Sequence, residues 1–209
     1  MRRLLIILFL PLFLAACGAE PVWAPDDAVA RAVYSSKESP SITLFTVINV
    51  ETGAGEHSAL IINGTQRVLF DPAGSWYHPY VPERNDVHYG ITDQMYTFYI
   101  DYHARVTYWV LEQTIPVSLE VAEALRAEVE AYGAVPKAFC SNSVSNVLSG
   151  LPGFESINTT MFPKTLSRAF GNLPGVISSE HYDGDPDDNS GVLMVTPAEL
   201  RAGVAPTLG

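Results

Sequence analysis

Cys140 is the residue of this sequence whose type and surroundings point most directly to chemistry. It is one of only two cysteines in the chain, the other being Cys17. A thiol becomes a strong nucleophile when a histidine takes its proton and a helix N-terminus favours the thiolate. Apolar residues recur at helical spacing over 144–151, which predicts a helix that begins at Cys140. The alternative is a buried structural cysteine, because Cys140 is also in register with that apolar stripe.

His57 and Asp71 are the candidates for the other two groups of a nucleophilic site. The β-branched segment 57–62 predicts a strand that opens with His57, and Asn63-Gly64 predicts a tight turn into an antiparallel strand. Asp71 directly follows that second strand, so both side chains are expected at the same end of the sheet. A carboxylate there can orient the imidazole. Taken singly, His57 can be a solvated strand residue and Asp71 a turn residue.

The histidine-led strand 57–62, the next strand leading to Asp71, and Cys140 at a helix start together resemble the circularly permuted papain-like cysteine hydrolases. That group is related to NlpC-type cell-wall peptidases and to lecithin:retinol acyltransferase, and in it the histidine strand precedes the cysteine helix. The resemblance spans residues 42–150 of this chain. It implies that Cys140 is the nucleophile and His57 the general base. It also implies that Asp71 orients His57.

Two alternatives remain for these roles. In the resembled family the third residue often lies within the strand, whereas Asp71 lies at the strand end. Asn63 is therefore an alternative third residue, although a weaker one. His103 is the second candidate for the base, since it lies between two further expected strands, 96–102 and 105–115.

An aromatic and polar block between the third strand and the cysteine helix is the candidate wall of a substrate cleft. Trp76 and Tyr77 belong to this block, and Tyr102 ends one of the expected strands. Tyr and Trp offer apolar faces with polar tips, which suits substrate binding. The alternative is a packed surface loop.

The remaining elements predict the fold class. Ser118 is the expected N-cap of an amphipathic helix that ends at Tyr132, and a second helix is expected up to Phe170 with Pro163 in its first turn. Together with the strands, these helices predict an α+β fold in which an antiparallel sheet packs with helices. The resemblance narrows this to a permuted papain-like core.

The first residues predict a cleaved secretory signal. Arg2 and Arg3 precede the apolar run 4–14, and small residues lead to Cys17. The Leu-Ala-Ala-Cys ending resembles a bacterial lipobox. This resemblance implies acyl chains such as palmitate on Cys17, and lipid anchoring on the periplasmic side of the cell envelope. Gly18 after the cysteine favours the outer membrane. The alternative is an ordinary secretory signal that happens to contain a cysteine.

Composition and charge narrow the class of protein. The chain has 209 residues, of which 47% are hydrophobic, and a formal net charge of −11. Such an acidic chain is not expected to bind nucleic acid, which requires basic side chains to neutralise phosphates. The expected organisation is a lipoprotein signal at 1–16, an N-terminal tether at 17–40, a papain-like domain at 41–182, and an acidic loop and tail at 183–209.

The acidic run 183–189 is expected to be a solvated loop. A calcium loop is the alternative, but its sixth position is Asp188 instead of Gly and its twelfth is Met194 instead of Glu. No metal-ligand spacing and no cofactor motif are present in the sequence.

The leading functional hypothesis is a lipid-anchored envelope cysteine hydrolase or acyl transferase that acts on an amide or ester, with peptidoglycan peptides as the nearest substrate by resemblance. A non-catalytic envelope binding or scaffold lipoprotein with a papain-like shape is the alternative from another class. A third hypothesis is a redox-sensing thiol protein. Contact among Cys140, His57 and Asp71 distinguishes the first hypothesis from the other two.

Overall fold

The computed structural model describes residues 18–188, and these form an antiparallel sheet with helices on both faces. The strands are β1 (Ser41–Asn49), β2 (Gly55–Asn63), β3 (Arg67–Phe70), β4 (Glu83–Arg84), β5 (Val87–Tyr89), β6 (Tyr108–Pro116) and β7 (Ile177–His181). The helices are α2 (Asp26–Ala32), α3 (Asp93–His103), α4 (Leu119–Tyr132), α5 (Cys140–Ser149) and α6 (Pro163–Gly171). The predicted α+β class is therefore confirmed.

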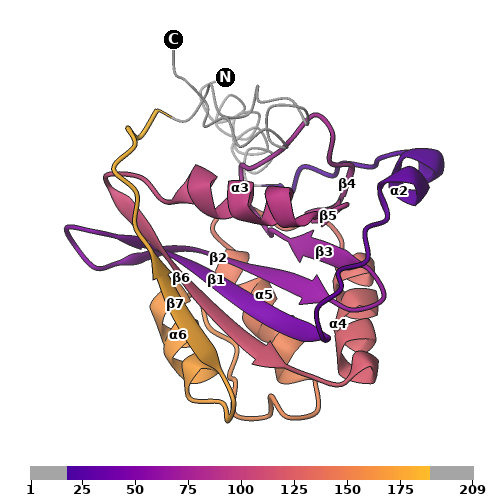
Figure 1. The fold of residues 1–209 in the computed structure, drawn as a ribbon. Coiled ribbons are helices and arrows are strands. Elements are labelled where there is room, and N and C mark those ends of the chain that lie inside the picture. Colours follow the sequence, from indigo (N-terminus) through magenta and orange to yellow (C-terminus); the bar gives the residue numbers. More distant parts are fainter. Residues whose placement is uncertain (1–17, 189–209) are drawn as a thin grey trace, which may run out of the picture.

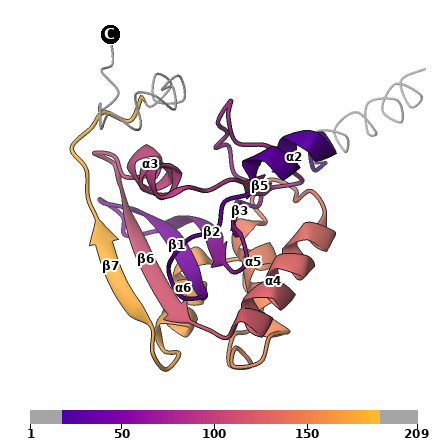
Figure 2. The same ribbon diagram turned by 45° about the vertical axis from the view of Figure 1, so that its right-hand side comes forward.

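The seven strands lie in the order β4-β5-β3-β2-β1-β6-β7, and every neighbouring pair is antiparallel. Helices α4, α5 and α6 lie on one face of the sheet and α3 lies across the other (Figures 1 and 2). Alternate side chains of β2 therefore enter two different cores, as the two-residue period of a strand requires. Leu60 and Ile62 pack with the three helices, whereas Ala59 and Ile61 pack with α3.

The helices expected after the sheet begin where the sequence indicates. The hydroxyl of Ser118 accepts a hydrogen bond from the Val121 N–H and caps α4, whose Leu125 and Val129 are buried. Pro163 occupies the first turn of α6, where its missing N–H costs nothing. These packed helices fix the position of α5, which starts at Cys140.

Residues 96–102, expected to form a strand, instead belong to helix α3. The aromatic residues there have high β propensity, but the hydroxyl of Thr92 accepts from the Met95 N–H and starts a helix. Met95, Phe98 and Tyr99 then lie on one buried face, at the spacing of a helix. The prediction of a strand over this segment is therefore wrong, and tertiary burial of that face is the reason.

The segment expected to be a tether packs onto the domain from residue 18 onward. It contains α2, and Trp23 forms a β-bridge with Arg84, whose guanidinium lies 4.6 Å from the Trp23 ring centroid. The Tyr34 carbonyl accepts a 2.8 Å hydrogen bond from the Arg67 N–H. Within residues 18–188, no helix has the length and hydropathy of a membrane span. The expected signal at 1–16 and the lipidation site Cys17 lie outside the described residues.

Candidate active site

Cys140 is the first residue of helix α5, where the sequence places it. The residue before the helix, Phe139, provides no side-chain cap, so the backbone N–H groups of the first turn stay available to the thiol. Ala138 has φ +70°, in the left-handed region that a side chain disfavours. This strained turn directly precedes Cys140, which lies at the end of the sheet. Cys140 is 7% exposed.

His57 and Asp71 come together as expected from the hairpin of β2 and β3. In the register of this pair Phe70 is opposite Leu60, so the residue after β3 reaches the end of β2 that carries His57. The His57 Nε2 lies 2.5 Å from Asp71 Oδ1. His57 is also hydrogen-bonded to the Cys140 thiol. The three side chains therefore form a continuous thiol–imidazole–carboxylate chain.

Helix α3 supports the acid end of this chain. The Tyr99 hydroxyl donates a 2.8 Å hydrogen bond to Asp71 Oδ1. His103, one turn further along α3, lies nearly parallel to His57, with ring centroids 6.0 Å apart. Its Nδ1 donates to the Tyr99 carbonyl. His103, the second candidate for the base, thus packs beside His57, while His57 contacts the thiol.

The charges of the site favour an ion pair. Burial alone would lower the pKa of His57, but the Asp71 carboxylate outweighs it and raises that pKa to about 10. Burial would raise the pKa of Asp71, but protonated His57 lowers it to about 2. Burial likewise opposes ionisation of Cys140, yet its hydrogen bond to His57 and the His57 charge hold the thiol pKa below that of an ordinary thiol. These shifts both favour the thiolate–imidazolium pair over the neutral thiol and imidazole.

His103 differs from His57 in charge, because among residues 18–188 it has no ion pair with a carboxylate. Burial lowers the pKa of His103 to about 4, although Asp71 acts in the opposite direction. His103 is therefore neutral at neutral pH and lies beside a charged His57. His88 is also buried near Asp71, and burial lowers its pKa to about 4. Because both of these rings are neutral at neutral pH, His57 is the charged histidine beside Asp71.

Two backbone N–H groups face the sulfur of Cys140. Those of Ser58, next to His57 on β2, and Ser141, in the first turn of α5, both donate to the thiolate and lower its pKa. Two donors that converge on an anionic sulfur can also bind an oxyanion that forms beside it.

A cavity of about 230 Å³ opens next to Asp71. Trp76 and Tyr77, two of the expected substrate-binding residues, line this cavity. Trp76 is buried, and its ring packs edge-on against Tyr99 at 5.4 Å between centroids. Tyr77 is exposed. The third expected residue, Tyr102, lies on α3, where its ring packs against His103.

The cavity presents polar atoms that the protein leaves unpaired. Within residues 18–188, Asp71 Oδ2, Trp76 Nε1 and His88 Nδ1 are buried without a hydrogen-bond partner. All three residues line the cavity. Since a buried unpaired donor or acceptor costs about 1–3 kcal/mol, these atoms indicate a space that accepts a polar molecule.

Asn63, the weaker alternative to Asp71, lies at the other end of β2. Its side-chain amide donates to the Ser39 carbonyl at 3.0 Å. Asn63 is buried at the opposite end of β2 from His57. The residue beside the imidazole is therefore Asp71 and not Asn63.

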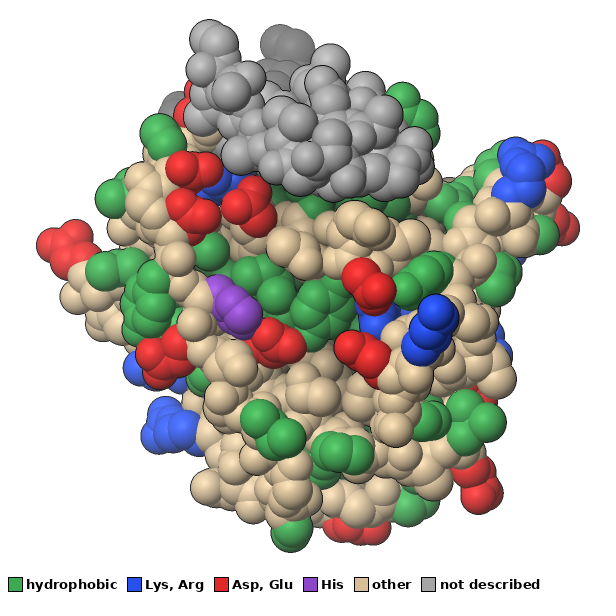
Figure 3. Space-filling model, viewed as in Figure 1, with side chains coloured by type: hydrophobic (Ala, Val, Ile, Leu, Met, Phe, Trp, Pro, Cys, Tyr) green, Lys and Arg blue, Asp and Glu red, His purple; other side chains and the backbone are tan. Residues whose placement is uncertain are grey.

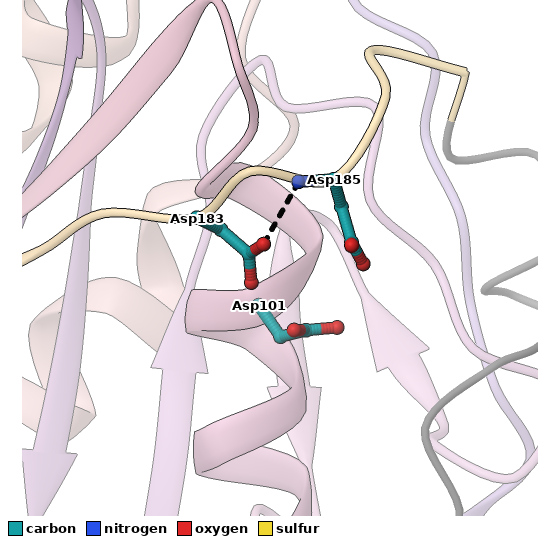
Figure 4. Close-up of side chains that lie close together, drawn as sticks. All are labelled: Asp101, Asp183 and Asp185. Atoms are coloured by element: carbon teal, nitrogen blue, oxygen red, sulfur yellow. Dashed lines mark hydrogen bonds between the residues drawn. The ribbon is translucent and has the colours of Figure 1, made fainter.

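The acidic loop folds back onto α3. Carboxylate oxygens of Asp101, Asp183 and Asp185 lie within 4.8 Å of one another (Figure 4). The Asp185 carboxylate accepts a 3.2 Å hydrogen bond from the Arg105 guanidinium, which also lies 3.9 Å from the Asp101 carboxylate. The loop expected to be solvated is thus pinned in part by a buried arginine.

Sequence reasoning did not find Tyr99 or the Ser58 N–H group. A strand over 96–102 gives no reason to expect contact between Tyr99 and Asp71. The signal that reveals it is Thr92-Asp93, a helix start, followed by apolar residues at helical spacing. The role of Ser58 depends on a backbone group, and no residue type encodes it.

Comparisons of the chain with protein-family models, with curated proteins and with solved structures give no match.

Proposed function

We propose that the protein is a cysteine hydrolase or acyl transferase that forms an acyl-enzyme at Cys140. The observation that carries the proposal is the continuous hydrogen-bonded chain from the Cys140 thiol through His57 to Asp71. A buried structural cysteine needs no imidazole partner, and a lone redox thiol needs no carboxylate behind one. The resemblance of the sequence to the circularly permuted papain-like hydrolases also supports a nucleophilic role for Cys140.

The reaction begins with attack of the Cys140 sulfur on a carbonyl carbon of an amide or ester. The carbonyl π electrons move to oxygen, and the N–H groups of Ser58 and Ser141 are placed to bind that oxyanion. Protonated His57 then gives its proton to the leaving nitrogen or oxygen, so the bond to the leaving group breaks and a thioester remains.

The second half of the reaction restores the thiolate. Neutral His57 takes a proton from water, or from the hydroxyl or amine of another acceptor, which attacks the thioester carbonyl. The carbon–sulfur bond breaks, the acyl group leaves with the acceptor, and the imidazolium and thiolate are regenerated. Asp71 stays ionised throughout and stabilises the imidazolium each time it forms.

The cavity lined by Trp76 and Tyr77 is the proposed substrate site. It adjoins Asp71 and offers unpaired polar atoms next to an aromatic ring. The proposal also includes lipidation at Cys17 and an outer-membrane location. At that location peptides of the bacterial cell wall are the proposed substrate. Gly18 also lines the cavity.

The test is detection of the acyl-enzyme. The full chain in detergent is mixed with p-nitrophenyl esters and with cell-wall peptides, and the intact mass and the modified residue are measured. We expect a rapid burst of nitrophenol and an acyl adduct on Cys140. The burst should be absent in Cys140→Ala and reduced at least about 100-fold in His57→Ala. His181→Ala, which removes a histidine from β7, is the matched control and should retain the burst.

The proposal would be overturned if Cys140 were alkylated only after denaturation and the folded protein formed no acyl adduct. It would leave the binding or scaffold protein as the better description. Fast alkylation that His57→Ala leaves unchanged would instead favour the redox thiol.

A further inference from the structure

The turn between β4 and β5 carries a side chain at a position where hairpins usually have glycine. Arg84 pairs with Val87 across this hairpin, so Asn85 and Asp86 form a two-residue turn. Their φ angles are +46° and +68°. Two positive φ angles are typical of the tight hairpin turn in which Asn-Gly is the preferred sequence. Asp86 therefore occupies a position that suits glycine better, which indicates that its side chain has a function of its own.

Asp86 is bonded to the turn after β3, which carries Asp71. The carbonyl of Asp86 accepts a 2.8 Å hydrogen bond from the Asp71 N–H. Its carboxylate accepts from the N–H of Ala73, a residue with φ +58°. The Gly74 N–H donates to the Asp71 carbonyl at 3.1 Å, so residues 71–74 form a tight turn. Asp86 thus holds this turn at two points, one of which is the N–H of Asp71 itself.

The same carboxylate is bonded to the loop that leads to Cys140. Asp86 Oδ2 accepts a 2.7 Å hydrogen bond from the N–H of Val135, which is buried. The Phe139 N–H donates to the Pro136 carbonyl at 3.2 Å. A single tight turn therefore joins Val135 to Cys140 and leaves little freedom between them. The position of Val135 thus helps to fix the first residue of α5.

Strained backbone occurs in each of the three segments that Asp86 connects. Within residues 18–188, positive φ angles of residues other than glycine are found at Ala73, Asn85, Asp86 and Ala138. They lie in the turn after β3, in the β4–β5 turn and in the turn before α5. Such conformations persist only where the surrounding structure holds them, and they are concentrated at functional sites. The strain therefore indicates that these connections place the site and do not serve stability alone.

The side chain of Asp86 is mainly a carboxylate at neutral pH. Burial is the main cause that raises its pKa, and the charges of Glu83 and Asp71 add to it. The Val135 N–H acts in the opposite direction, and the resulting pKa is about 6. Figure 3 shows acidic side chains at several separate places on one face of the molecule, so charge alone does not distinguish Asp86. Its hydrogen bonds to two segments of the site do.

We propose that Asp86 is a positioning residue, which ties the turn that carries Asp71 to the loop that carries Cys140. The proposal rests on the proposed function, since it takes Cys140, His57 and Asp71 as the active site. His57 lies between the other two groups in the hydrogen-bonded chain, so the spacing of turn and loop determines whether the imidazole reaches both. Asp86 also lines the cavity beside Asp71, so this tie forms part of the wall of the proposed substrate site.

The test is the rate of Cys140 alkylation by iodoacetamide against pH, measured on the full chain in detergent. Asp86→Gly suits the positive φ and removes the carboxylate. We expect it to raise the apparent pKa of the thiol and to slow alkylation at pH 7 at least about tenfold, because the imidazolium is no longer held against the sulfur. Loss of a negative charge alone would favour the thiolate and shift this pKa in the opposite direction.

Two control variants separate the tie from effects of the turn and of charge. Asn85→Gly makes the same change at the other residue of the turn, and Glu20→Gln removes a charge from an exposed residue of the same cavity. Both should keep the parent pH profile. Urea titration reports whether each variant folds. If Asp86→Gly does not fold, Asp86→Asn replaces it, because asparagine tolerates a positive φ and keeps one acceptor oxygen. It should shift the profile in the same direction by a smaller amount.

The positioning role is overturned if the folded Asp86 variant has the same pH profile as Asn85→Gly, even where its stability to urea is lower. The burst with nitrophenyl esters distinguishes this failure from failure of the proposed function. A burst in the parent chain with an unshifted profile in the Asp86 variant refutes the positioning role and leaves the catalysis standing. A shifted profile in a chain that forms no acyl adduct supports the tie between the two segments and refutes the catalysis.

Discussion

The hydroxyl of Tyr99 donates to the same oxygen of Asp71 that faces His57. Asp71 Oδ1 therefore has two partners at 2.5 and 2.8 Å, one from a strand and one from a helix on the α3 face. Two donors on one oxygen fix the direction of the carboxylate, and the carboxylate in turn fixes the imidazole. Tyr99 is thus a positioning residue, which acts on the chemistry through Asp71.

Tyr99→Phe should lower the free energy of unfolding by about 1.5–3 kcal/mol, the usual contribution of a hydrogen bond to a charged group. Urea titration of the full chain measures this loss. Tyr182→Phe is the matched control, because its exposed hydroxyl bonds to Glu180 on the surface. It should change stability by less than about 0.5 kcal/mol. Equal losses in the two variants would show that Tyr99 does not support Asp71.

The pH dependence of Cys140 alkylation reports the state of the thiol. Because the pKa of Cys140 is lowered, its rate of reaction with iodoacetamide should begin to fall at a lower pH than the rate of an ordinary thiol does. In His57→Ala, burial is no longer opposed by the imidazolium, so the thiol pKa should rise and the rate at pH 7 should fall at least about tenfold. A profile that His57→Ala does not displace would contradict the ion pair.

Gly74 tests the placement of Asp71 without a change in the acid itself. A Cβ at Gly74 would lie 2.0 Å from Asp71 Oδ2, so Gly74→Ala must displace that carboxylate. We expect slower acylation and alkylation of Cys140 in a folded protein. Gly150→Ala is the control, because nothing lies within 4 Å of its Cβ and its φ of −86° suits alanine. Retained reactivity in Gly74→Ala would mean that the position of Asp71 is not critical.

The stability of the fold should depend on Asp71 at acid pH. Its folded pKa of about 2 is below the ordinary 3.8, so its ionised form stabilises the native state above pH 3.8. That stabilisation is lost as the pH falls through about 2. The difference in unfolding free energy between the parent chain and Asp71→Asn should therefore shrink on acidification. Urea titrations at several pH values measure it, and Asp27→Asn should show a much smaller trend, because the ion pair of Asp27 with Arg31 is exposed. A constant difference down to pH 2 would rule out ionised Asp71 as the cause.

The sequence was sufficient for the parts of the site that depend on residue type and local spacing. Cys140 at a helix start, and His57 and Asp71 at one end of a hairpin, follow from turn signals and two-residue alternation, and the structure brings these residues together. The β2–β3 turn at Asn63-Gly64 is local, so its register could be predicted from few residues.

The parts that sequence reasoning did not reach depend on long-range packing. Residues 96–102 are rich in aromatics and resemble a strand, but burial of Met95, Phe98 and Tyr99 against the sheet selects a helix. A hollow of about 460 Å³ lined by Asn63, Arg67 and Tyr96 could not be foreseen either, because its lining comes from separate strands and from α3.

The three residues of the proposed active site come from β2, from the turn after β3 and from the start of α5, so no local segment contains them together. In the unfolded chain Cys140 is an ordinary thiol with a pKa of about 8.5, and only a few per cent of it is thiolate at neutral pH. Reactivity therefore arises only when distant segments have docked. The rate at which Cys140 is labelled during refolding would therefore report when the last of these segments has docked.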